Sequence, residues 1–147
     1  TCQEDIVLVA DNTMQYHAPE TNRTQDFVIS KNKHQPTRRK ISFVCENIIS
    51  KIGSKLSSET ATHEFIGLAK FTKTGAEQLL QTYEDCVKNY RGKFQEAEDI
   101  NLFKFTDLIQ EMIDRGYVIN FLEIHKGWLE IHSEKDIELA NHFLSDS

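Results

Sequence analysis

The 147-residue sequence has few of the features that define specialised protein classes. Its three cysteines, Cys2, Cys45 and Cys86, are odd in number and widely spaced, which argues against a disulfide framework. The sequence contains no CxxC pair, the spacing that would indicate a zinc site. No apolar run approaches the roughly 20 residues that span a bilayer. With 17 basic against 23 acidic residues, the formal charge is −6, which disfavours broad nucleic-acid binding.

No signal peptide is visible at the start of the sequence. The chain starts at Thr1, without Met and without the charged and apolar regions of a signal peptide. We therefore expect a cytoplasmic location. The missing Met also predicts that sequence has been lost upstream of Thr1.

The composition is that of one globular domain. Hydrophobic residues make up 39% and charged residues 27%, and there are nine Phe. Folding of a chain of this length buries roughly 68–70% of the surface that the unfolded chain exposes. We predict a single domain over residues 1–147. Both prolines fall in residues 12–40, which we interpret as a long loop or insertion with one short strand near Phe27–Ile29.

Hydrophobic periodicity predicts a mixture of strands and helices. Continuous or alternating apolar residues indicate a buried strand at 5–10, a hairpin of 41–44 with 48–51, and strands at 63–71, 117–124 and 128–131. Helical spacing indicates helices over 72–90 and 102–113, the second ending at Gly116, and a last helix that opens at Ser133 with a capping box. The last helix should turn Ile137, Ala140, Phe143 and Leu144 inward. The fold class is therefore α/β, with a mixed sheet and about three helices.

Three segments, 64–75, 108–116 and 127–140, resemble the carboxy-terminal half of a nucleotidyltransferase domain. The similarity is to cytidylyltransferase-like enzymes that activate phosphocholine or 2-aminoethylphosphonate, including those fused to phosphoenolpyruvate phosphomutase. It covers most of the chain, and the tryptophan segment Gly127-Trp-Leu-Glu-Ile131 is its most specific part. The resemblance implies a nucleotide-diphospho-sugar-transferase-like, Rossmann-like half-domain.

The same resemblance implies an activity. Such enzymes transfer CMP from CTP to the phosphoryl oxygen of a phosphonate or phosphocholine-type substrate and release pyrophosphate. Magnesium and basic side chains stabilise the charge that develops. The partners implied are a nucleoside triphosphate and a small phosphorylated or phosphonylated substrate.

Two departures from the family pattern stand out. No GxGxxR-type loop for the triphosphate is present in the sequence. The aspartate that the family has two positions after Glu130 is His132 here, and imidazole is a poor replacement for a magnesium ligand. On a strand, Glu130 and His132 would share one side as residual metal ligands. The alternative is an exposed strand end whose histidine has no role or caps the next helix.

The resemblance suggests three substrate-binding residues. Glu64 and Gly67 match a strand that contacts the substrate in related enzymes, although Gly67 could instead only permit close packing of strand and helix. Lys55, after Ile52-Gly53, lies where a phosphate-contacting lysine is expected, although a surface lysine is the default interpretation. No catalytic residue is assigned.

These observations give two hypotheses. The first is an incomplete nucleotidyltransferase that supplies acceptor contacts and part of a magnesium shell. The second is a catalytically degenerate domain kept for ligand binding or assembly. Either one leaves a strand edge and apolar surface uncovered, so we expect a homo-oligomer or a partner half.

Overall fold

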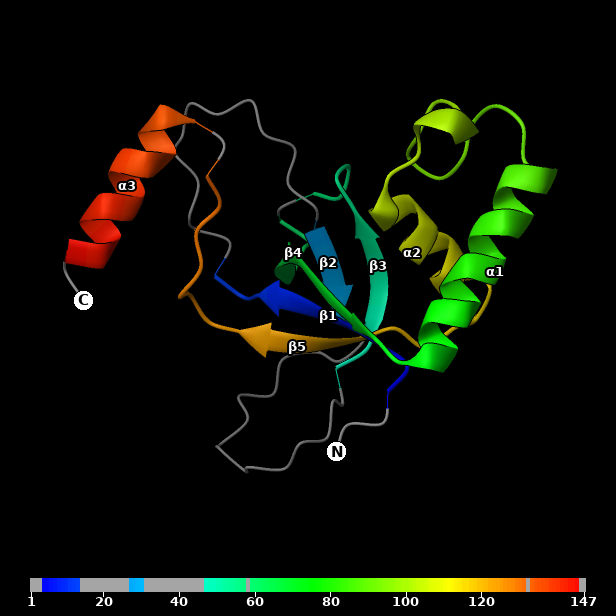
Figure 1. Ribbon diagram of the computed structural model, residues 1–147, viewed down its shortest axis with the longest axis horizontal. Coiled ribbons are helices and arrows are strands. Elements are labelled where there is room, and N and C mark those ends of the chain that lie inside the picture. Colours follow the sequence, from blue (N-terminus) through cyan, green and yellow to red (C-terminus); the bar gives the residue numbers. More distant parts are fainter. Residues whose placement is uncertain (1–3, 14–26, 31–46, 58, 132, 146–147) are drawn as a thin grey trace.

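A five-stranded mixed sheet forms the centre of the protein in a computed structural model that describes residues 4–13, 27–30, 47–57, 59–131 and 133–145 (Figure 1). The strand order is β3-β2-β4-β1-β5. The strands are β1 Ile6–Asp11, β2 Phe27–Ser30, β3 Ile49–Gly53, β4 His63–Phe71 and β5 Asn120–Ile124. The helices are α1 Lys73–Asn89, α2 Phe105–Asp114 and α3 Glu134–Ser145, with a 3₁₀ turn η1 at Ile100–Leu102. The predicted α/β class with a mixed sheet and three helices is confirmed.

The buried strand β1 holds the sheet together. It pairs antiparallel with β4 and parallel with β5. Ile6, Leu8 and Ala10 are at most 1% exposed and lie in the main core. This is the run of β-branched and aliphatic residues expected of a strand covered on its helix side.

The sheet curls until its two edges meet. Ile48 forms an isolated antiparallel bridge with Asn120, on the outer side of β5. Two backbone hydrogen bonds of 2.9 Å flank it, from the Ile49 amide to the Ile119 carbonyl and from the Phe121 amide to the Asn47 carbonyl. Residues on both sides of the start of β3 therefore close part of the edge that β5 would otherwise expose.

Helices α1 and α2 lie together beside the sheet, whereas α3 lies well away from them (Figure 1). Ile109 and Met112 of α2 are fully buried in the main core together with Ile49 and Ile52 of β3. A second, smaller apolar cluster joins α1 to the segment after it, through Cys86, Phe94, Ile100 and Leu108. The helix side of the sheet thus contains both cores.

Local sequence signals set the helix ends. The Thr72 hydroxyl accepts from the Gly75 amide and caps α1. Gly116, at φ +92°, follows the Arg115 cap of α2, and its amide and that of Tyr117 donate to Ile113 and Met112. At the start of α3, Ser133 and Asp136 exchange hydrogen bonds. All three ends match the predictions, and the capping box is confirmed.

Some predicted elements need correction. The 128–131 segment is not a strand; it follows Lys126 and Gly127, which both have positive φ (62° and 83°) and redirect the chain. The first hairpin arm, 41–44, lies outside the described residues, so the hairpin with 48–51 stays a prediction. Among the described residues, β3 pairs with β2. That pairing confirms the short strand expected near Phe27–Ile29.

The helices differ from the sequence predictions in where α2 begins and in one residue of α3. Residues 100–102 form a 3₁₀ turn, so α2 begins only at Phe105. Ile137 is 48% exposed, so the prediction that it points inward is wrong. The side chains of residues 143 and 144 lie outside the described set. No helix among the described residues combines the length and the apolar character needed to cross a bilayer.

Candidate functional site

The candidate site lies where β1 and β5 end. Asp11, the last residue of β1, pairs with Ile124 of β5 on one side and with Glu64 of β4 on the other. The pairing continues from Glu64 through Phe27 to Gly53, the last residue of β3. Ligands of α/β proteins bind outside the carboxyl ends of parallel strands, such as this end of β1 and β5.

Asp11 is a fully buried carboxylate surrounded by donors. Its Oδ1 accepts from the Thr13 amide at 3.1 Å and from the Lys126 amide at 3.2 Å. Its Oδ2 accepts from the Thr13 hydroxyl at 2.6 Å and from the Trp128 indole Nε1 at 2.8 Å. These four donors fill the roughly four acceptor positions of a carboxylate, and they fasten the 126–128 segment across the end of β1.

The hydrogen bonds around Asp11 favour its charged form. Burial by itself raises the pKa of this carboxyl group, but the bonds from Thr13, Trp128 and Lys126 outweigh it and leave the pKa below the ordinary 3.8. Asp11 is therefore a negative charge at neutral pH, although its side chain is 0% exposed.

Another polar group lies at the same end of β4 and β5. His63 is 2% exposed, and its Nε2 is 2.6 Å from Glu123 Oε2, while its Nδ1 is 2.7 Å from the Thr62 hydroxyl. The ring of Phe121 packs edge-on against His63 with 4.6 Å between centroids. These contacts fix the imidazole between β4 and β5.

The segment after β5 completes this strand-end site. His125 Nδ1 lies 2.8 Å from Asn12 Oδ1, and the next two residues turn the chain back toward Asp11. Trp128 is half-buried here and binds Asp11 directly. Trp128 therefore holds the segment after β5 against the end of β1.

Of the predicted substrate residues, Glu64 and Gly67 belong to β4 near this end. Glu64 is 1% exposed and pairs with Asp11. Gly67 lies in a β-bulge, because three residues of β4, 66–68, oppose Val9 alone. It is exposed, its φ is +83°, and an added Cβ would meet nothing within 4 Å. Close packing is therefore not the reason for this glycine; its backbone conformation is.

Lys55, the third predicted substrate residue, lies just beyond β3 and is engaged by the loop between α1 and η1. Its Nζ donates to the Glu96 carbonyl at 2.7 Å and lies 3.7 Å from the Glu98 carboxylate. The backbone amide of Lys55 donates to the Glu96 carboxylate as well. Gly53, two residues earlier, is in register with Glu64 across β2, about 10 Å away along the sheet.

The described residues do not offer a magnesium site. No three His, Cys, Asp or Glu side chains among them are placed to hold a metal ion. The oxygens of Asp11 are already occupied by four donors. Glu130 is half-buried on an irregular segment, so the strand geometry invoked for Glu130 and His132 is absent at Glu130, and His132 lies outside the described residues.

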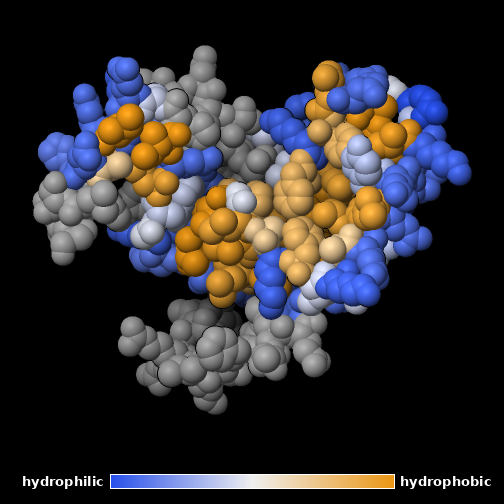
Figure 2. All heavy atoms as spheres, viewed as in Figure 1, coloured by the Kyte–Doolittle hydropathy of each residue, from blue (hydrophilic) through white to orange (hydrophobic). Residues whose placement is uncertain are grey.

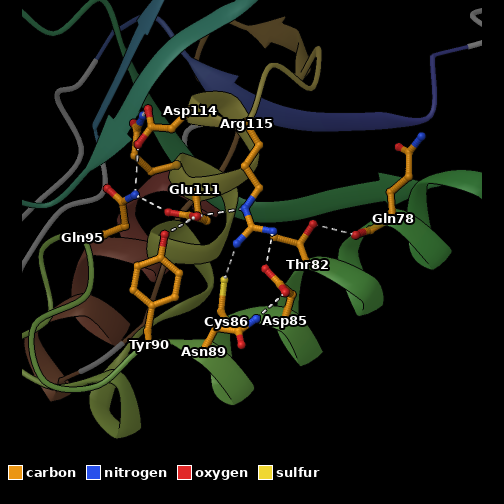
Figure 3. Close-up of polar contacts among 11 residues, drawn as sticks. Gln78, Thr82, Asp85, Cys86, Asn89, Tyr90, Gln95, Glu111, Asp114 and Arg115 are labelled. Atoms are coloured by element: carbon orange, nitrogen blue, oxygen red, sulfur yellow. Dashed lines mark hydrogen bonds and ion pairs between the residues drawn. The ribbon is translucent and has the colours of Figure 1, made fainter.

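A second polar cluster joins α1 to α2, away from the strand ends (Figure 3). The Arg115 Nε donates to Glu111 at 2.9 Å, and its Nη1 lies 2.7 Å from Asp85. Glu111 also accepts from the Tyr90 hydroxyl and from the Gln95 amide. An open groove of about 450 Å³ lies beside it, lined by Gln81, Thr82, Glu84, Asp85, Lys88, Arg115 and Tyr117.

The geometry of this second cluster indicates a structural brace. Glu111 is 6% exposed and has a lowered pKa, because hydrogen bonds from Arg115, Gln95 and Tyr90 outweigh the opposing effect of burial. Cys86, beside Arg115, is fully buried and its thiol pKa is raised, chiefly by burial. It is the small buried hydrophobe that its helical position predicts.

Sequence reasoning missed two residues of these sites, Asp11 and Glu96. A signal existed for Asp11, because it is the first polar residue after the apolar run of β1 and so marks the end of a buried strand. No pattern near Glu96 marks it, since its contacts are with Ser54 and Lys55, about 40 positions earlier in the chain (separations of 42 and 41).

Comparison with solved structures gives a match to the fold of this chain. The structure of the inositol-1-phosphate CTP transferase from T. maritima aligns with a TM-score of 0.59 and 19% sequence identity. The chain resembles part of a nucleotidyltransferase fold. The alignment covers 98% of this chain and 45% of that one, so the chain spans less than half the length of the enzyme it matches.

At this level of identity the likeness establishes the fold alone. No protein-family model matches the sequence, and no curated protein matches it either. The fold shared with a CTP-using enzyme agrees with the resemblance seen in the sequence, and the acceptor substrate is left open by it.

Proposed function

We propose that the chain is the acceptor-side part of a CTP-dependent nucleotidyltransferase that transfers CMP to a small phosphorylated or phosphonylated compound. The observation that supports this most strongly is the fold shared with an inositol-1-phosphate CTP transferase along nearly the whole chain. The polar strand end supports it too, because Asp11 and Glu64 lie side by side there.

The charge of the strand-end site favours a particular class of acceptor. Asp11 and Glu64 bring two carboxyl groups to one end of the sheet, and the indole of Trp128 lies against Asp11. Carboxylates and an indole ring attract an ammonium group. We therefore favour phosphocholine or 2-aminoethylphosphonate over inositol 1-phosphate, which has no cationic group.

In this proposal Glu64 and Gly67 contact the acceptor and Lys55 binds its phosphate. The acceptor's own phosphoryl oxygen is the nucleophile, so the chain needs no nucleophilic side chain. The triphosphate loop, and the magnesium that the resemblance implies, would be contributed largely from outside the described residues, because these assemble no metal site.

Calorimetric titration tests the proposal directly. The purified chain is titrated with CTP, with and without magnesium, and then with phosphocholine, 2-aminoethylphosphonate and inositol 1-phosphate. We expect measurable binding of an amine-bearing acceptor, weaker binding of inositol 1-phosphate, and little binding of CTP by this chain alone. Absence of binding for all three acceptors would contradict the proposal.

The second candidate is a catalytically degenerate domain retained for ligand binding or assembly. The full set of hydrogen bonds on Asp11 favours it, because a carboxylate held by four protein donors has no acceptor position left for a metal. In this case, acceptors would bind but no CMP transfer would follow, even when the chain is supplied with the triphosphate-binding part of a related enzyme.

A further inference from the structure

The turn after β3 forms a cradle for an oxyanion, and an internal carboxylate lies in it. The cradle consists of Gly53, Ser54 and Lys55. The Ser54 amide donates to Glu96 Oε2 at 2.8 Å, the Ser54 hydroxyl donates to the same oxygen at 2.9 Å, and the Lys55 amide donates to Oε1 at 3.0 Å. Three donors thus converge on one carboxylate.

Gly53 allows this close approach. A Cβ at position 53 would lie 2.2 Å from Glu96 Oε1, so any other residue would push the carboxylate out. Glycine followed by consecutive backbone amides, a hydroxyl and a lysine is the donor set that holds phosphate groups in many proteins. A carboxylate is a smaller and less charged oxyanion than a phosphate monoester.

Lys55 closes the cradle from the outside. Its ammonium group donates to the Glu96 backbone carbonyl at 2.7 Å and lies near Glu98, with 61% of its side chain exposed. If the Glu96 side chain moved away, this ammonium group would be within reach of whatever replaced the carboxylate.

We propose that the cradle is a binding site for the tetrahedral oxyanion of a phosphate or phosphonate monoester, and that Glu96 is its built-in competitor. Ligand binding then requires the Glu96 side chain to leave, which makes the α1–η1 loop a gate. The inference rests on the proposed function in one respect, since it assigns to this cradle the phosphate group of the acceptor.

The placement of the cradle agrees with that role. Gly53 is in register with Glu64 through Phe27, so the cradle and the carboxylates of the strand-end site lie along one row of the sheet. A bound phosphate group would lie at one position of this row and the acidic groups at another. Acceptor phosphate and acceptor amine would then contact opposite parts of the site.

The test is the binding of inorganic phosphate, without any nucleotide, followed by ¹⁵N NMR at constant ionic strength. In Glu96→Ala the cradle is empty, and we expect phosphate to bind about tenfold more tightly than to the unmodified chain, with shifts of the Ser54 and Lys55 amides. Adding Lys55→Ala to that variant should reverse the gain. Glu77→Ala is the matched control, because it removes an exposed carboxylate on α1, away from the cradle, and should change nothing.

The phosphate affinities of the Glu96 variants decide whether the cradle binds phosphate. A folded Glu96→Ala chain that binds phosphate no more tightly than the unmodified chain overturns the proposal, as does tighter binding of acetate than of phosphate. If Glu96→Ala does not fold, Glu96→Ser removes the carboxylate from the cradle and keeps a small polar side chain at position 96, and an unchanged phosphate affinity there overturns the proposal equally. Phosphocholine and CTP then identify the source of the oxyanion by which of them binds more tightly.

These outcomes are separable from those of the proposed function. Phosphate binding to the opened cradle with no preference for any acceptor supports the cradle and contradicts the acceptor assignment. Acceptor binding that is the same in Glu96→Ala as in the unmodified chain supports the acceptor assignment and contradicts the cradle.

Discussion

Asp11 shows how one buried carboxylate organises the strand-end site. Two of its four hydrogen bonds come from Thr13, two residues further on. The other two come from Lys126 and Trp128, more than a hundred positions later in the sequence. An ionised group that is 0% exposed is stable only when such donors replace its lost hydration. The charge of Asp11 therefore holds the tryptophan segment against the end of β1.

Replacing Asp11 by asparagine tests this role. The amide nitrogen of Asn cannot accept a hydrogen bond, so two of the four donors would lose their partner. We expect Asp11→Asn to lower the free energy of unfolding by about 2–3 kcal/mol. Urea unfolding followed by the fluorescence of Trp128, the single tryptophan of the chain, measures the change. Glu77→Gln, an exposed residue paired only with Lys73 at 3.9 Å, is the control and should stay within about 0.5 kcal/mol.

The pH dependence of stability follows from the same groups. The folded-state pKa values of Asp11 and Glu111 lie below their ordinary values of 3.8 and 4.5. The unfolded chain therefore binds more protons in this range, and the stabilisation is complete above the ordinary values and lost as the pH falls through the lower, folded ones. We expect the free energy of unfolding to decrease on acidification from pH 5 to about pH 3, less steeply in Asp11→Asn. Equal slopes in the two chains would contradict the assignment.

At the scale of elements, local sequence signals were sufficient to predict several of the strands and helices. The apolar run of β1, the helical spacing of α1 and the glycine at the end of α2 predicted elements that the structure contains. The prediction of a strand over 128–131 was wrong because it relied only on the β-branched and aromatic content of that segment. A distant hydrogen bond to Asp11 and two positive-φ residues determine its path instead.

The pairing of strands could not be predicted from local signals either. No local pattern in the sequence indicates that β3 pairs with β2, whose last residue precedes it by 19 positions. The row that runs from Gly53 through Phe27 to Glu64 depends on this pairing and on that of β2 with β4. Site residues were therefore predictable only where a family resemblance or a strand end marked them.

Gly67 gives a prediction at the same scale. Its φ of +83° costs a residue with a Cβ about 1–2 kcal/mol, while the space around it is open. Gly67→Ala should lose about this much stability, measured by urea unfolding. If Gly67 also shapes the acceptor site, acceptor affinity should fall as well.

Gly92 provides the matched control for this variant. It has φ +71°, its added Cβ would also meet nothing within 4 Å, and it lies in the loop after α1. Gly92→Ala should show the same stability loss with unchanged acceptor binding. Equal binding by both variants would remove Gly67 from the site and leave it as a bulge residue.

At the scale of the whole molecule, the chain has the fold of part of a larger enzyme and an apolar surface that its own helices leave exposed. Figure 2 shows this surface over β5 and the middle of the sheet. Leu122 in β5 and Val118 just before it are 52% and 59% exposed. Exposed apolar area of this kind marks contact with another chain or segment, so the expectation of a homo-oligomer or partner half stays a prediction.

The central claim is that the carboxyl ends of β1 and β5 bind the acceptor of a cytidylyltransferase reaction. The most direct measurement is an ¹⁵N NMR titration of the intact chain with phosphocholine, 2-aminoethylphosphonate and inositol 1-phosphate. We predict that the amine-bearing acceptors shift the amides of Asn12, Glu64 and Lys126 at millimolar concentration, and that inositol 1-phosphate shifts them less. Shifts confined to the groove beside Arg115, or no shifts at the strand ends with any of the three, would contradict the account.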